Sequence, residues 1–393
     1  MKTISHTSVI TLLFTMLISC TVSQQNRVAS SSCVQESAPI DTYSRAAGIN
    51  KALEKLTRSG VPGVAFAVYS AEGWWETAAG LADLESKLPM QPCHLQYLQS
   101  VSKTYMAAAI LKLYEEKKLK LDTPITAYLP EKYSRYITGA EQVTVRMLLN
   151  HTSGIPEYNY APAYVSKLLQ QPEFPFTAGE YLTYIQGKPL DFAPGSKYSY
   201  RNVNYVILTL MADAITGNHA AYISEAIFKP LGLVHTFYRN EPGYLDYPNI
   251  PSSYWDRHSN SIVENVSLLQ RNNVRNMVGD DGMVSTPKDA VMFLKGLLEG
   301  KLLAPETLEL MKTWVMGPKG NNEYGLGLDH ALIGGYRAWG HSGGGIGAGC
   351  QLYYFPDKNV YFFAGINLGT VTDSPLHKEA EAALNALYRA MLD

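Results

Sequence analysis

The order in which strand and helix patterns occur constrains the fold of this chain more than any other feature. An apolar strand pattern runs from Val64 to Tyr69 and leads through an Ala-Glu-Gly turn into a second strand pattern. Strand patterns return only near the C-terminus, at residues 324–330, 336–343, 348–355 and 360–368, ahead of a closing helix pattern. Between the two ends, helical patches alternate with Pro- and Gly-rich loops. This order predicts an α/β fold of the α+β type, with an antiparallel sheet flanked by helices and an inserted, mostly helical domain.

We expect one catalytic domain over residues 41–393. Its α/β part would comprise about 41–121 and 275–393, and the helical insertion about 122–274. A cleft between the two parts is the natural position for an active site.

The N-terminal 20 residues resemble an export signal. One lysine precedes an apolar run from Val9 to Ile18, which is too short for a stable transmembrane helix. The sequence LISC, ending at Cys20, resembles a bacterial lipobox, and lipid on Cys20 would anchor the chain to a membrane. A plain signal peptide with a chance cysteine is the alternative. Residues 21–40 are polar and small, and predict a flexible tether. We therefore expect an exported lipoprotein at the periplasmic or cell-envelope face.

Three cysteines remain after Cys20, namely Cys33, Cys93 and Cys350. They allow one disulfide in an oxidising compartment, but their spacing does not show which two pair. No Cys/His cluster has metal-ligand spacing, so no metal site is expected. The formal net charge of −2 gives no reason to expect a nucleic acid as partner.

The sequence GHSGG at residues 340–344 matches G-x-S-x-G, the nucleophile elbow of α/β-hydrolases. An elbow lies on a strand-to-helix turn, with an Asp and then a His later in the chain. Here a strand, a turn and another strand follow, and the only later histidine is His377, inside the closing helix. We therefore do not expect Ser342 to be the nucleophile.

A second serine fits that role better. Ser100 and Lys103 form an S-x-x-K pattern at the start of a helix rich in Ala and Leu. Three residues make nearly one helical turn, so the two side chains can touch. A lysine with a lowered pKa can take the serine proton, and a helix N-terminus favours the oxyanion. A capping serine followed by a surface lysine is the alternative.

Two further patterns accompany S-x-x-K. Tyr200 and Asn202 form Tyr-x-Asn on a loop before an apolar helix. Tyr200 can share proton transfer with Lys103, and Asn202 can hold a substrate carbonyl or orient Lys103. The strand at residues 341–344 offers backbone groups to an extended substrate.

These three patterns, in this order, resemble the serine β-lactamase and penicillin-binding DD-peptidase superfamily, and in detail its class C β-lactamase branch. The resemblance runs from about Val61 to Leu368 and implies a β-lactamase/transpeptidase-like fold. The connecting segments LLNHTSGIP (148–156), FAPGSKYSYRNVNY (192–205), DGMVSTPKDAVMF (281–293) and YGLGL (324–328) are also similar to family landmarks.

The resemblance implies a role for each catalytic candidate. Ser100 matches the acylated nucleophile, and Lys103 matches its proton-transfer partner. Tyr200 matches the general base that also protonates the leaving group. Asn202 matches the amide that orients the substrate.

The resemblance also implies a binding strand. His341, Ser342 and Gly343 match the third motif, and the backbone N–H of Gly344 joins that of the nucleophile in the oxyanion hole. The β-lactamases usually have Lys where this chain has His341, and a histidine is less reliably charged near pH 7, which weakens any claim on a substrate carboxylate. A structural histidine that bonds its neighbours is the alternative for His341. We expect His151, on a turn, to be structural.

Together these features predict a serine hydrolase that acts through a Ser100 acyl-enzyme and needs no cofactor. The expected substrates are small molecules or peptides of the D-Ala-D-Ala, β-lactam or ester type, as for a D-alanyl-D-alanine carboxypeptidase. An esterase or D-aminopeptidase on the same scaffold is one alternative. A penicillin-binding or sensing protein without turnover is another.

Overall fold

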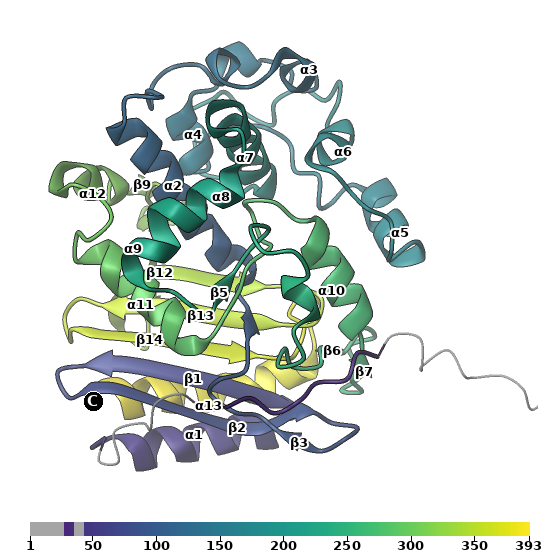
Figure 1. Cartoon of the computed structure of the whole chain (residues 1–393), viewed down its shortest axis with the longest axis vertical. Helices are drawn as coiled ribbons and strands as arrows, with labels where there is room; N and C mark the ends of the chain where they lie inside the picture. The colour runs from purple at the N-terminus through teal and green to yellow at the C-terminus, as the bar shows by residue number, and fades with distance from the viewer. Residues whose placement is uncertain (1–26, 35–42) are drawn as a thin grey trace, which may run out of the picture.

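The computed structural model describes residues 27–34 and 43–393. In this part of the chain the largest sheet has nine strands in the order β3-β2-β1-β14-β13-β12-β11-β10-β9 (Figure 1). Its centre joins the two ends of the chain, because β1 (Gly63–Ser70) pairs antiparallel with β14 (Val360–Ile366). The predicted antiparallel sheet assembled from both ends is therefore confirmed.

The other strands of this sheet follow in antiparallel order on either side. Their bounds are β2 Gly73–Asp83, β3 Leu88–Pro89, β9 Val315–Met316, β10 Asn322–Tyr324, β11 Asp329–Ile333, β12 Tyr336–Gly344 and β13 Gly349–Phe355.

Helices cover both faces of the sheet, as predicted. Alternate side chains of a strand point to opposite faces, so Val64 and Phe66 of β1 pack in one apolar cluster with α1 (Ala46–Arg58) and α13 (Pro375–Leu392). Ala67 belongs to the larger cluster on the other face, which includes α2 (Ser102–Glu115) and α11 (Pro287–Leu298). In Figure 1, α1 lies at the lower edge of the sheet, α13 is seen behind β1 and β2, and most other helices lie above these strands.

The middle of the chain is mostly helical, and its boundaries as a separate domain stay a prediction. Its helices are α3 Glu131–Ser134, α4 Val145–Leu149, α5 Pro162–Gln170, α6 Ala178–Thr183, α7 Asn202–Thr216, α8 His219–Ile223, α9 Lys229–Leu231 and α10 Ser267–Asn276, and α12 (Pro305–Met311) follows later. Short strands form two small sheets, from β4 Gln96–Tyr97, β5 Thr236–Phe237 and β8 Val284–Ser285, and from β6 Tyr254–Trp255 and β7 Glu264–Asn265.

One predicted strand is wrong in part. Residues 324–330 do not form a single strand, because β10 ends at Tyr324 and β11 begins at Asp329. The intervening turn lies against α2, where a Cβ on Gly327 would be 2.1 Å from the Cβ of Ala107. Gly327 also has φ +80°, which favours glycine. Close approach to a helix distant in sequence therefore breaks the strand.

The predicted flexible tether also needs a correction. Residues 27–34, which lie within the predicted tether, are hydrogen-bonded to the body of the protein. The backbone N–H of Ser31 donates to the carbonyl of Pro248 (2.7 Å), and the hydroxyl of Ser30 donates to that of Ile250 (2.7 Å). Hydrogen bonds to the folded protein therefore hold a segment most of whose side chains are exposed.

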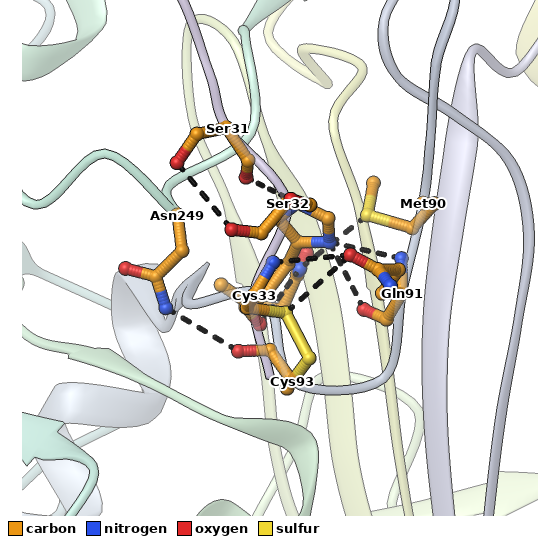
Figure 2. The surroundings of a disulfide bond; sticks show 9 residues. Ser31, Ser32, Cys33, Met90, Gln91, Cys93 and Asn249 are labelled. Carbon is orange, nitrogen blue, oxygen red and sulfur yellow. Dashed lines mark hydrogen bonds between the residues drawn. A yellow bond between two sulfur atoms is a disulfide. The ribbon is translucent and has the colours of Figure 1, made fainter. Parts of the chain in front are cut away.

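A disulfide also links the same segment to the body of the protein. It joins Cys33 to Cys93, whereas Cys350 is a buried free thiol. The side-chain oxygen of Gln91 accepts from the Cys33 backbone N–H at 3.1 Å, as Figure 2 shows. We call residues 27–34 with this disulfide the strap. The predicted signal peptide and Cys20 lie outside the described residues. Within those residues, no helix is both long and apolar enough to span a bilayer.

Candidate active site

Ser100 lies in a short 3₁₀ turn, η1 (Gln99–Val101), directly before α2. Gln99 has φ +49°, a left-handed conformation that costs an L-residue about 1–2 kcal/mol. Strand β12 holds this turn from one side, because a Cβ on Gly343 would lie 2.5 Å from the carbonyl oxygen of Leu98 and 2.7 Å from the Cβ of Gln99. Gly343 thus permits the close approach that fixes the backbone at Ser100.

Lys103, one turn later, is fully buried and contacts Ser100 directly. Its Nζ donates to the Ser100 Oγ at 2.9 Å and to the backbone carbonyl of Asp280 at 2.7 Å. Burial lowers the pKa of Lys103, and the carboxylates of Asp280 and Asp281 oppose that shift. A lysine with a lowered pKa spends more time uncharged, and the uncharged amine can accept the proton of Ser100.

Tyr200 lies just before α7, with its ring centroid 5.2 Å from the Lys103 Nζ. Its buried hydroxyl has no hydrogen-bond partner among the described residues. Burial raises the pKa of Tyr200 well above its usual value, although the adjacent hydroxyl of Ser100 opposes this. In the free protein Tyr200 is therefore a neutral phenol whose O–H is available for proton transfer. Asn202 begins α7, and its backbone N–H donates to the carboxylate of Glu157.

The ring of His151 packs against the ring of Tyr200. It is fully buried, its ring centroid lies 4.3 Å from that of Tyr200, and its Nδ1 accepts from the backbone N–H of Arg201 at 3.2 Å. Burial and then the neighbouring Lys103 lower the pKa of His151 well below its usual value. A neutral ring that is tilted against the ring of Tyr200, at 37°, and bonded to the next backbone N–H can position Tyr200.

His341 on β12 is held by partners on both ring nitrogens. Its Nδ1 lies 2.5 Å from the carbonyl oxygen of Ser342, and its Nε2 lies 2.8 Å from the hydroxyl of Tyr324. A carbonyl only accepts, so Nδ1 carries the proton and Nε2 accepts from Tyr324. Burial and then Lys103 lower the pKa of His341 to about 3. At neutral pH the ring is uncharged and has no free N–H for a substrate carboxylate.

These residues surround a cleft of about 350 Å³, which we call the serine cleft. It is lined by Ser100, Tyr198, Tyr200, Glu323, Tyr324, Asp329, His341, Ser342 and Gly344. Of the residues predicted from sequence, Asn202 and Gly343 lie outside this lining, and Lys103 lies behind Ser100. Sequence reasoning did not single out Tyr198, Glu323, Tyr324 or Asp329. The sequence could have identified Tyr324, because it begins the YGLGL segment. No spacing pattern in the sequence identifies Asp329.

A second, larger cavity of about 660 Å³ lies beside the strap, and we call it the strap groove. Its lining comprises Ser31, Ser32, Cys33, Val34, Trp74, Glu76, Pro92, Cys93, Gly232, Val234, His235, Pro248, Asn249, Thr286, Lys288, Asp289 and Met292. Figure 2 shows the disulfide between Cys33 and Cys93, two residues that line the strap groove. Across the described ranges, no group of three or more His, Cys, Asp or Glu side chains could hold a metal ion.

A family model described as Beta-lactamase matches residues 49–386, which is most of the chain. The chain belongs to the Beta-lactamase family. A D-stereospecific amidohydrolase from Streptomyces sp. has a similar structure, with a TM-score of 0.73 and 28% identity over 85% of this chain and 98% of that one. The Beta-lactamase fold predicted from the sequence is therefore confirmed.

Two curated relatives extend the comparison. A putative D-alanyl-D-alanine carboxypeptidase of Escherichia coli (strain K12) is 26% identical over 56% of this chain, and esterase EstB of Burkholderia gladioli is 32% identical over 49%. The matches span about half of each relative, 54% and 52%. Relatives named as carboxypeptidase, esterase and amidohydrolase support hydrolase activity and leave the substrate open.

Proposed function

We propose that this protein is a serine hydrolase that forms an acyl-enzyme on Ser100. The observation that carries the proposal is the contact between Ser100 Oγ and the buried Nζ of Lys103, at 2.9 Å. A serine hydroxyl is a weak nucleophile until a neighbouring base takes its proton. Burial lowers the pKa of Lys103 and so supplies such a base.

In the proposed mechanism, Ser100 Oγ attacks the substrate carbonyl and its proton passes to Lys103. The backbone N–H groups of Ser100 and Gly344, which both line the serine cleft, would stabilise the oxyanion. The tetrahedral intermediate then collapses, the bond to the leaving amine or alcohol breaks, and the hydroxyl of Tyr200 protonates that group. Water then gives a proton to the Tyr200 phenolate and attacks the acyl-enzyme ester. The acid product leaves, and Lys103 returns its proton to the Ser100 Oγ.

Small amides and esters are the substrate class that the serine cleft favours. Recognition of a substrate carboxylate, as in D-Ala-D-Ala or a penicillin, calls for a cation or free N–H donors. His341 is neutral and both its nitrogens are occupied. The names of the Streptomyces amidohydrolase and of esterase EstB agree with an amidase or esterase. Penicillin binding is the second candidate, because the Escherichia coli relative is named a D-alanyl-D-alanine carboxypeptidase.

We further propose export as a lipoprotein, which rests on the LISC sequence ending at Cys20. The disulfide of the strap agrees with an oxidising, extracytoplasmic compartment. Labelling of cells with a radioactive fatty acid tests the lipid, and Cys20→Ala should abolish the label.

Intact-mass measurement after mixing with p-nitrophenyl acetate or benzylpenicillin tests the acyl-enzyme. We expect an acetyl adduct on the peptide that contains Ser100, and its loss in Ser100→Ala. Ser342→Ala is the matched control, and it should still be acylated. An adduct on Ser342, or none with any ester, would refute the proposal. A long-lived penicillin adduct would favour the second candidate.

A further inference from the structure

The wall of the serine cleft formed by β10 and β11 carries two carboxylates, Glu323 and Asp329. Both line the same cavity as Ser100. Among the described residues that line this cavity, none is lysine or arginine, and His341 is neutral. The cavity therefore contains negative charge without a matching cation.

The contacts of the two carboxylates are with neutral groups. Asp329 accepts from the hydroxyl of Tyr353 at 2.6 Å, and Glu323 accepts from the side-chain amide of Asn321 at 2.9 Å. Neither has an ion pair with another described residue. Burial raises the pKa of Asp329 to about 6, and the nearby Glu323 adds to the shift. Glu323 and Asp329 are both partly buried. A carboxylate that is partly shielded from water and has no counter-ion is destabilised, and a bound cation would reduce that cost.

The remaining walls of the serine cleft are aromatic. Tyr198 and Tyr324 are stacked with ring centroids 6.1 Å apart, and Tyr200 meets Tyr324 edge-on at 6.2 Å. Ring faces attract a cation through their electron density, and the effect strengthens where water is excluded. Carboxylates combined with a cluster of tyrosine rings suit an ammonium group. They disfavour a carboxylate, which would meet two like charges.

We propose that the serine cleft binds substrates through a primary ammonium group, held by Glu323 and Asp329 against the tyrosine rings. This rests on the proposed acyl-enzyme at Ser100. A cavity of about 350 Å³ lies at the small end for ligand sites. The ammonium and the reacting carbonyl must therefore belong to one small unit. The substrate class is amides or esters of single amino acids with a free amino group.

Three p-nitroanilides of phenylalanine test the proposal: the free amine, its N-acetyl derivative and its N-succinyl derivative. Both enantiomers are assayed and the faster one is used. We expect kcat/KM for the free amine to exceed that for the N-acetyl compound at least tenfold, with the N-succinyl compound slowest. In the double variant Glu323→Gln, Asp329→Asn, the preference for the free amine should fall at least tenfold. Glu381→Gln, which removes one exposed carboxylate on α13, should keep the wild-type preference.

The outcomes separate this proposal from the one it rests on. Wild-type preference for the N-acetyl or N-succinyl compound would overturn ammonium binding, and so would an unaltered preference in the double variant. In either case acetylation of Ser100 by p-nitrophenyl acetate would leave the acyl-enzyme standing. Absence of that adduct would refute both. Thermal denaturation of the double variant checks that it is folded.

Discussion

The serine cleft and the strap groove both contain carboxylates that are at least partly buried, but they differ in which groups face those charges. In the strap groove, burial raises the pKa of both Glu76 and Asp289. Lys288 opposes the rise at both acids, and His235 opposes it at Asp289. All four residues line that cavity. The strap groove therefore places basic side chains beside its acids.

The serine cleft has no such arrangement. Its acids, Glu323 and Asp329, meet neutral donors and aromatic rings. Among the described residues that line it, the only basic one is the uncharged His341. The smaller cavity, about 350 Å³ against about 660 Å³, also holds the nucleophile candidate. The volume of a cavity thus shows only that a ligand would fit. Carboxylates without a counter-ion beside a candidate nucleophile are the better indication of a catalytic site. Four predictions test this contrast.

Removal of the base should have the largest effect. Lys103→Ala takes away the group that we propose accepts the proton of Ser100, and general-base catalysis contributes about 10²–10⁴-fold. We expect kcat/KM for p-nitrophenyl acetate to fall about 10³-fold. Because the variant also opens a buried cavity, circular dichroism must first show native structure. A folded Lys103→Ala with wild-type turnover would place the base elsewhere.

Removal of the disulfide should alter stability and leave the chemistry alone. Cys33→Ser with Cys93→Ser opens a loop with a sequence separation of 60, for which chain entropy gives about 4 kcal/mol of unfolding free energy. Urea denaturation measures the loss, and kcat/KM for p-nitrophenyl acetate should stay within about twofold. Reduction of the wild type should reproduce the effect. A large loss of turnover in folded protein would show that the strap controls the serine cleft.

Asp329→Asn should stabilise the protein at neutral pH. The folded-state pKa of Asp329 is about 6, above its value of about 3.9 in an unfolded chain. The unfolded state therefore ionises first, and the wild type loses stability as the pH rises from about 4 to about 6. One pKa unit corresponds to about 1.4 kcal/mol, so the loss from this residue approaches about 3 kcal/mol. Urea denaturation at pH 4 and pH 7 measures it. Equal stability differences at both pH values would contradict the assignment.

The smallest effect should come from the matched acid of the strap groove. Glu76→Gln removes a carboxylate whose charge already faces Lys288. We expect less than about a twofold change in kcat/KM for every phenylalanine p-nitroanilide. A loss of preference for the free amine in this variant would erase the distinction between the two cavities.

Local sequence patterns predicted those parts of the fold and site that depend on neighbours in the chain. The contact between Ser100 and Lys103 follows from helical spacing, and the sheet follows from alternating apolar residues. The position of Asp329 in the serine cleft depends instead on strand pairing, because it lies opposite Gly340 of β12. The pairing of Cys33 with Cys93 likewise depends on long-range contacts. Such contacts leave no periodic signal in the sequence.

The strap limits how far the folded domain could lie from a membrane. If Cys20 carries the proposed lipid, seven peptide units separate it from Arg27, whose guanidinium pairs with Glu85 at 3.5 Å. An extended chain spans at most about 3.3–3.6 Å per residue, so the segment between Cys20 and Arg27 is no longer than about 25 Å. A flexible tether of 20 residues would allow the domain to move farther from the membrane. With the proposed lipid on Cys20, the strap would instead hold the domain close to the bilayer, and the substrates within its reach would be those in a thin layer at the membrane surface.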